Sequence, residues 1–251
     1  LWINDQLVIF EGGLKRGPSP SGTYYDPVDI APYLTKGSNT IAILLWHFGK
    51  DGFSHINSGK AALLFEAIAP GLEIVSDASW QCALYEAYQN TEAPFPNYRM
   101  PESNIRFDAR QAITNWNRTS FEGFVPGAVC VGKAGKAPFG DLVERPIPQW
   151  KNSGLLSYVS VRESLKGDTL FCRLPYNAQI TPYLKVEAEA GKTIHIRMDN
   201  YEGGSERNVR AEYITREGEQ EYESYGWMNG HEVYYIIPEG VKVLDLSLIH
   251  I

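Results

Sequence analysis

The sequence predicts an all-β protein made of two domains. Residues 1–150 contain no sustained apolar stripe with helical spacing, and instead hold short β-branched and apolar runs. Glycine and proline, 23 and 15 in number, separate these runs as turn and loop residues do. From about residue 156 onward, apolar runs recur at intervals of roughly ten residues, which is typical of a β-sandwich.

The first predicted element is a β-hairpin at the N-terminus. Two short apolar arms flank Asn4-Asp5, a polar pair that tolerates the left-handed backbone of a tight turn. Further strands are expected in β-branched and apolar runs at 40–46, 61–67 and 71–75. Three prolines, Pro94, Pro96 and Pro101, exclude regular structure between them.

The second half predicts a regular series of strands. We expect them at 158–161, 170–174, 183–188, 192–198, 209–215, 220–225 and 231–237. Residues 192–198 alternate polar and apolar side chains, the period of a half-buried strand. Asn229-Gly230 is the strongest two-residue hairpin signal in the chain, so the sequence predicts a turn there.

These elements suggest domains at 1–140 and 156–245, joined by an extended linker at 141–155. Residues 133–140 are small, basic and rich in glycine and proline, and Arg145-Pro146-Ile147-Pro148 is stiffened by its prolines. The last six residues, 246–251, match a peptide encoded by a common sequencing adapter, and residue 1 is not methionine. We therefore expect a metagenomic fragment, truncated at both ends, with a non-native tail at 246–251.

Composition argues against several classes of function. The 251 residues carry a formal net charge of -7 without a clustered basic stripe, which argues against a nucleic-acid partner. No run approaches the length of a membrane span. Cys82, Cys130 and Cys172 are too widely spaced for a zinc site or a disulfide scaffold, so we expect three buried apolar side chains. We expect no metal site and no cofactor.

Two stretches carry a resemblance to known families. Residues 25–34 and 36–43, beginning Tyr25-Asp26-Pro27, resemble the galactose-binding-like jelly roll attached to many glycoside hydrolases. Residues 210–215, 218–224 and 226–233 are similar to bacterial α-L-rhamnosidases, in the β-sandwich that precedes their catalytic domain. Residues 101–108 and 142–148 agree with the same family, so the resemblance extends to about Asp245. It implies a jelly roll followed by a second β-sandwich.

The resemblance also implies a function for a longer protein. In that family an (α/α)₆ barrel hydrolyses terminal α-L-rhamnosyl groups with inversion, using an acid carboxyl and a base carboxylate. This sequence shows no such helical pattern, so no catalytic residue is assigned and the chain alone is expected to be inactive. The implied partners are a rhamnose-containing glycan and the missing C-terminal barrel, and the implied location is periplasmic or extracellular.

Residues 46–55 form the segment best suited to sugar binding. Aromatic rings stack on pyranose faces, and Asp or His side chains bind hydroxyl groups, which makes Trp46, Asp51 and His55 candidate substrate-binding residues. The segment follows a predicted strand, where loops commonly carry binding sites. The alternatives are that Trp46 simply ends a core strand and that the histidine is an ordinary polar loop residue.

The run Glu217, Glu219, Glu221 and Glu223 is the other conspicuous motif. Alternation along a strand would place these carboxylates on one face, where we expect a solvated surface rather than catalytic acids or a calcium site. The sequence therefore leaves three hypotheses: ancillary domains of a glycoside hydrolase, a stand-alone carbohydrate-binding module, or a purely structural pair of β-domains.

Overall fold

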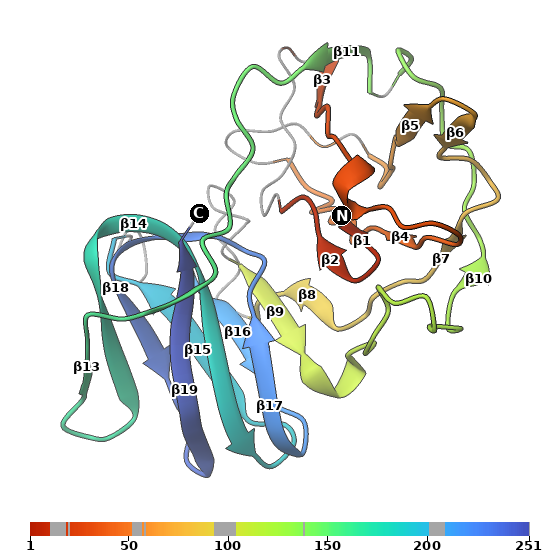
Figure 1. Ribbon diagram of the computed structural model, residues 1–251. Coiled ribbons are helices and arrows are strands. Elements are labelled where there is room, and N and C mark those ends of the chain that lie inside the picture. Colours follow the sequence, from red (N-terminus) through yellow and green to blue (C-terminus); the bar gives the residue numbers. More distant parts are fainter. Residues whose placement is uncertain are drawn as a thin grey trace. The chain divides into compact units, whose positions relative to one another are not determined.

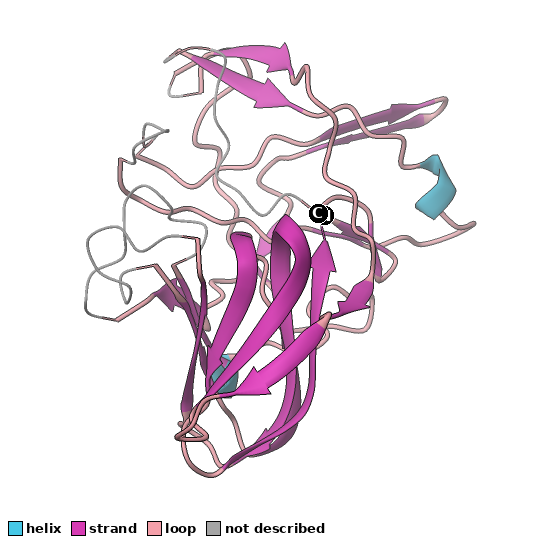
Figure 2. Cartoon of the chain, turned by 90° about the vertical axis from the view of Figure 1, so that its left-hand side faces the viewer, coloured by secondary structure: helices cyan, strands magenta, loops and turns pink. Residues whose placement is uncertain are grey.

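Nearly all regular structure in the computed structural model is β-strand, which confirms the predicted all-β class (Figure 2). The structure describes residues 1–10, 19, 21–51, 57, 59–92, 104–137, 139–200 and 209–250. It divides into two compact units. The described residues of unit 1 lie in Leu1–Phe10, Leu14–Leu84 and Thr114–Gln149, and those of unit 2 lie in Tyr85–Ile113 and Trp150–Ile251.

Unit 1 begins with the predicted hairpin. Strands β1 (Trp2–Ile3) and β2 (Gln6–Leu7) pair antiparallel, and β4 (Ile41–Ala42) pairs with β1 on its other side. The two turn residues, Asn4 and Asp5, have φ angles of 50° and 70°, as a tight hairpin turn of this kind requires. The structure therefore confirms this element as the sequence predicts it.

The other described strands of unit 1 form short two-stranded ladders (Figure 1). Strands β5 (Glu66–Ala69) and β6 (Leu72–Val75) make a hairpin whose turn contains Gly71 at φ 79°. Strand β7 (Gln81–Cys82) pairs with β10 (Val125–Pro126), while β3 (Gly22–Tyr25) pairs in parallel with β11 (Asp141–Glu144). A short 3₁₀ helix, η1, covers Ala31–Tyr33.

Unit 2 is organised by one long strand, β14 (Thr169–Ala188). Its first part pairs with β13 (Ser160–Glu163) and β18 (Met228–Ile236), and its last part pairs with β17 (Gly218–Glu223) and β19 (Val241–His250). The prediction of separate strands at 170–174 and 183–188 is wrong. The register shifts between Arg173 and Ala178 instead of the strand ending, so one strand continues across the irregularity.

The remaining strands extend the sheet away from β14. The order from β18 is β15 (Thr193–Met198), β16 (Ala211–Ile214), β9 (Ile105–Asp108) and β8 (Tyr88–Asn90), with β12 (Leu155–Ser157) paired to β19 at the other end. A 3₁₀ turn, η3 (Ala109–Gln111), follows β9. Tyr222 of β17 stacks on Phe107 of β9 at 5.0 Å although the two strands are not paired, so the sheet folds over into two facing layers.

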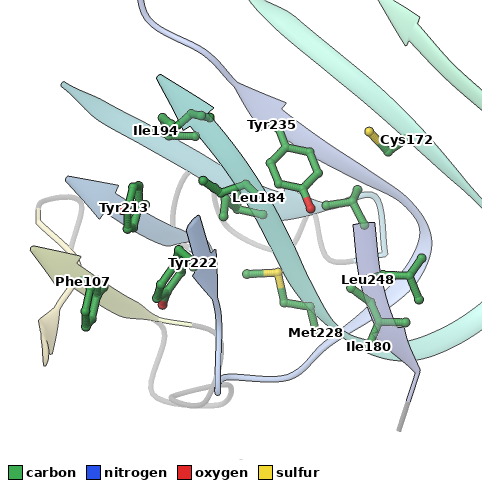
Figure 3. Close-up of a cluster of buried hydrophobic side chains, with 14 of the residues drawn as sticks. Phe107, Cys172, Ile180, Leu184, Ile194, Tyr213, Tyr222, Met228, Tyr235 and Leu248 are labelled. Carbon is green, nitrogen blue, oxygen red and sulfur yellow. The ribbon is translucent and has the colours of Figure 1, made fainter. Parts of the chain in front are cut away.

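The core of unit 2 lies between these layers (Figure 3). Its apolar side chains come from strands distant in sequence, and several are completely inaccessible to solvent: Ile180, Leu184, Ile194, Val233 and Tyr235. Aromatic stacking continues from Tyr222 to Tyr213 at 4.8 Å. Burial of large side chains on this scale is the main term that holds a β-sandwich together.

The predicted turn at Asn229-Gly230 is wrong. Both residues lie inside strand β18, where Asn229 pairs with Gln179 and Gly230 pairs with Ala178. A Cβ atom on Gly230 would lie 2.4 Å from Oδ1 of Asp199, so glycine leaves room for the Asp199 side chain against the strand. A local sequence pattern does not distinguish a glycine in a strand from a glycine in a turn, and Gly230 lies in a strand.

Candidate functional site

The predicted sugar-binding segment follows β4 in unit 1. Trp46 is half-buried, and its ring lies edge-on to the buried Phe48 with centroids 6.3 Å apart. Asp51 is exposed, and its Oδ1 accepts a hydrogen bond of 2.8 Å from the amide of Asn57. His55 lies outside the described residues. In the described part of this segment, no hydrogen bond or ring contact joins Trp46 to Asp51, and their role in binding stays a prediction.

The acidic run does not form a pair of carboxylates suited to acid–base catalysis. Glu219 pairs with Lys185 at 2.7 Å, which lowers the pKa of Glu219, and Glu221 accepts a hydrogen bond of 2.8 Å from the Tyr183 hydroxyl. Burial, reinforced by Glu221, raises the pKa of Tyr183 to about 12. Glu223 differs from the solvated surface expected of this run, because it is half-buried and burial raises its pKa to about 7.

Sequence reasoning missed the most conspicuous polar cluster, which surrounds Glu212 in unit 2. The Glu212 side chain is 1% exposed, and its Oε1 accepts hydrogen bonds from Nε and Nη2 of Arg210 at 2.8 and 2.6 Å. Strand pairing brings His195 of β15 and Arg106 of β9 to either side of Glu212. Nδ1 of His195 lies 3.6 Å from Oε1, and Nε of Arg106 lies 3.9 Å from Oε2.

Backbone groups complete this Glu212 cluster. The Glu92 amide donates to Oε2 of Glu212 at 3.3 Å, and Nη2 of Arg210 donates to the Glu92 carbonyl at 2.7 Å. The Arg210 amide donates to the buried Asn104 side chain at 3.3 Å. These contacts compensate a buried charge and join β16 to the β8–β9 region, which is a structural role. In the sequence, the only sign of this cluster was the charged Glu212 within the otherwise apolar run 211–214.

The cysteines depart from expectation. Cys172 is completely buried, as predicted, and burial raises the pKa of its thiol to about 12. Cys82 and Cys130 are exposed, so the prediction of three buried side chains is wrong for these two. Both lie in unit 1, where the described strands are short and bury fewer side chains completely than those of unit 2.

The described residues contain neither a metal-binding cluster nor a membrane-spanning helix. No group of three or more His, Cys, Asp and Glu side chains is placed to hold a metal ion within the described ranges. None of the helices that the structure describes has the length and apolar character needed to cross a membrane.

These observations define a two-unit, all-β protein. Its fold is similar to that of an α-L-rhamnosidase from Dictyoglumus thermophilum, with 18% identity and a TM-score of 0.62 over 96% of this chain and 29% of that chain. It is also similar to an α-L-rhamnosidase from Aspergillus terreus, with 17% identity and a TM-score of 0.65 over 98% of this chain and 30% of that chain.

The chain thus spans about 30% of the length of the rhamnosidases that it matches. At 17–18% identity the similarity establishes the fold alone. It therefore confirms the resemblance inferred from the sequence as far as the fold is concerned. No protein-family model matches the sequence, and no curated protein matches it either.

Proposed function

We propose that this chain is the non-catalytic N-terminal β-domain part of an α-L-rhamnosidase-like glycoside hydrolase that acts on terminal rhamnosyl groups of glycans. One observation carries the proposal: almost the whole chain matches less than a third of each rhamnosidase chain. The Glu212 cluster is consistent with it, because its charges are engaged in structural contacts between segments of unit 2. The catalytic barrel would then belong to the rest of the longer protein.

Two measurements test this proposal. The 251-residue chain is incubated with an aryl α-L-rhamnopyranoside, and no release of the aryl group above the uncatalysed rate is expected. The source DNA downstream of the region encoding Asp245 is then read, and it should encode a helical domain with paired carboxylates. Hydrolysis by the chain itself would contradict the non-catalytic role, and an open reading frame without such a domain would contradict the enzyme assignment.

A second candidate function is carbohydrate binding by unit 1 through Trp46, Asp51 and His55. The edge-on contact of Trp46 with the buried Phe48 favours it, because this contact fixes the indole ring while leaving it partly accessible. Affinity electrophoresis in gels containing rhamnose-rich glycans is the test. Trp46→Ala and Asp51→Ala should both reduce retardation, and a wild-type chain that no glycan retards would contradict this function.

The third candidate, a purely structural role, is favoured by exposed apolar side chains on unit 2. Leu156, Val159 and Val161 are 43, 63 and 52% exposed, and they lie in or between β12 and β13 at the sheet edges. A contiguous apolar patch built from such side chains would be typical of a surface that a neighbour covers. Under this hypothesis, replacing all three with serine should leave the fold intact and reduce binding of a hydrophobic dye.

A further inference from the structure

The connection from β17 to β18 runs beside residues 180–183 of β14 and carries a row of half-buried side chains. Along residues 223–230, half-buried and buried positions alternate strictly. The buried positions are Ser224, Gly226, Met228 and Gly230, and the half-buried ones are Glu223, Tyr225, Trp227 and Asn229. We call the second set the 223–229 row. It contains one carboxyl, two large aromatic side chains and one amide.

Neighbouring residues hold two members of this row in place. The Trp227 ring meets Trp150 edge-on, with centroids 6.4 Å apart and an interplanar angle of 87°. The Asn229 amide lies between two other amides, donating to Asn177 at 3.0 Å and accepting from Asn200 at 2.6 Å. Side chains fixed in this way lose little conformational entropy when a ligand binds, which favours recognition.

Glu223 is the member whose environment the fold leaves unexplained. Its carboxyl is half-buried, yet within the part of the chain that the structure describes it makes no hydrogen bond and no ion pair. Desolvating a carboxyl without a compensating donor costs free energy, and burial accordingly raises the pKa of Glu223 to about 7. A hydroxyl donor from a ligand would supply the missing partner.

We propose that the 223–229 row is a binding site for a neutral pyranoside, separate from the Trp46 segment. Tyr225 and Trp227 would pack against the apolar C–H faces of the sugar ring, while Glu223 and the Asn229 amide would bind its hydroxyl groups. The class of ligand follows from this mixture. An anionic ligand would be repelled by Glu223, and a purely apolar ligand would leave the Glu223 carboxyl without a donor.

The test is a titration of the full chain with methyl glycosides of neutral hexoses and 6-deoxyhexoses, followed by ligand-observed NMR and calorimetry. Choline serves as a matched cationic probe, because a carboxyl beside aromatic rings is also suited to a quaternary ammonium group. Trp227→Ala should weaken glycoside binding by about tenfold or more, and Trp227→Phe should retain part of it. Tyr176→Ala is the control, since Tyr176 is a 56% exposed aromatic residue of unit 2 outside the row.

Each outcome decides the proposal. Glycoside binding that Trp227→Ala and Asn229→Ala weaken and Tyr176→Ala does not would support it, with folding of each variant checked by circular dichroism. Absence of binding by every glycoside at millimolar concentration, or tighter binding of choline, would overturn it. Binding lost only in Trp46→Ala would also overturn it, while leaving the unit 1 carbohydrate-binding function standing. Should Trp227→Ala fail to fold, Asn229→Ala and Trp227→Phe decide the question.

Discussion

At the scale of single residues, the most consequential contact is the ion pair between Arg210 and Glu212. Both side chains are almost fully buried, at 6 and 1% exposure, so neither charge is solvated by water. A buried pair adds little net stability compared with apolar residues of the same size, but removal of one partner leaves the other charge uncompensated. Any neutral substitution at position 212 would leave the buried charge of Arg210 uncompensated.

Glu212→Gln should therefore destabilise unit 2 by about 3–5 kcal/mol. Glu187→Gln is the matched control, because Glu187 pairs with Lys242 at 3.0 Å with both side chains more than half exposed. Exposed pairs of this kind contribute about 0–1 kcal/mol. Urea unfolding followed by circular dichroism measures both variants. Equal effects of the two substitutions would show that the Glu212 cluster is not the structural network described above.

The second prediction at this scale concerns Glu223 and the dependence of folding stability on pH. Its pKa is about 7 in the folded chain against an ordinary value of 4.5, so the folded state holds its proton more tightly than the unfolded state. Its contribution to stability is therefore fully present below about pH 4.5 and is lost as the pH rises toward 7, by up to about 3 kcal/mol in total.

Glu223→Gln isolates this effect from other titrating groups. The variant cannot ionise at this position, so it should gain stability relative to the wild type as the pH rises, with little further change above about pH 8. The measurement is the difference in unfolding free energy between the two proteins at several pH values. A difference that is constant with pH would contradict the raised pKa.

At the scale of elements, local patterns predict those features whose cause is local. The Asn4-Asp5 hairpin depends on two residues that accept positive φ, and the strand at 193–198 depends on simple alternation of side chains, so both could be read from the sequence. The continuity of β14 past Pro175 depends on partners supplied by β18 and β19, more than forty residues away. The Glu212 cluster depends on the parallel pairing of β16 with β9 in the same way.

Strand β18 provides the prediction at this scale. A Cβ atom at Gly230 would lie 2.4 Å from Oδ1 of Asp199, and that oxygen accepts hydrogen bonds from the amides of His231 and Glu232 at 2.8 and 3.0 Å. Gly230→Ala must displace Asp199 and lose these bonds, so we expect a loss of about 1–3 kcal/mol.

The control for β18 is Gly132→Ala. Its new Cβ would meet its nearest neighbour, the Ala137 carbonyl oxygen, at an ordinary contact distance of 3.5 Å. Thermal unfolding of both variants should show a lower midpoint for Gly230→Ala alone. If Asn229-Gly230 formed a hairpin turn instead, Gly230→Ala would act through backbone strain, and removing Asp199 by Asp199→Ala would not relieve it. Because Gly230 lies in a strand, we expect that adding Asp199→Ala to Gly230→Ala relieves the clash, so that the two losses of stability are not additive.

At the scale of the whole molecule, the notable property is that unit 2 is not continuous in sequence. Residues 85–113 belong to it, although segments of unit 1 lie on both sides of them in the chain. They supply β8 and β9, including Phe107, whose ring stacks on Tyr222 at 5.0 Å, and Asn104, which accepts a hydrogen bond from the Arg210 amide. Removing them would expose one side of β16 and leave the Glu212 cluster without Arg106.

A polypeptide of residues 150–251 should therefore fail to fold cooperatively, whereas residues 85–251 should fold, because only the latter retains both halves of unit 2. The lost aromatic packing and the disrupted buried charges together cost about 6–10 kcal/mol, which is comparable with the margin of about 5–15 kcal/mol by which domains are stable. Cooperative thermal unfolding monitored by circular dichroism, together with dispersion of amide NMR signals, distinguishes the two. A well-dispersed, cooperative 150–251 polypeptide would mean that β8 and β9 are dispensable and that the sandwich begins only after the 141–155 segment.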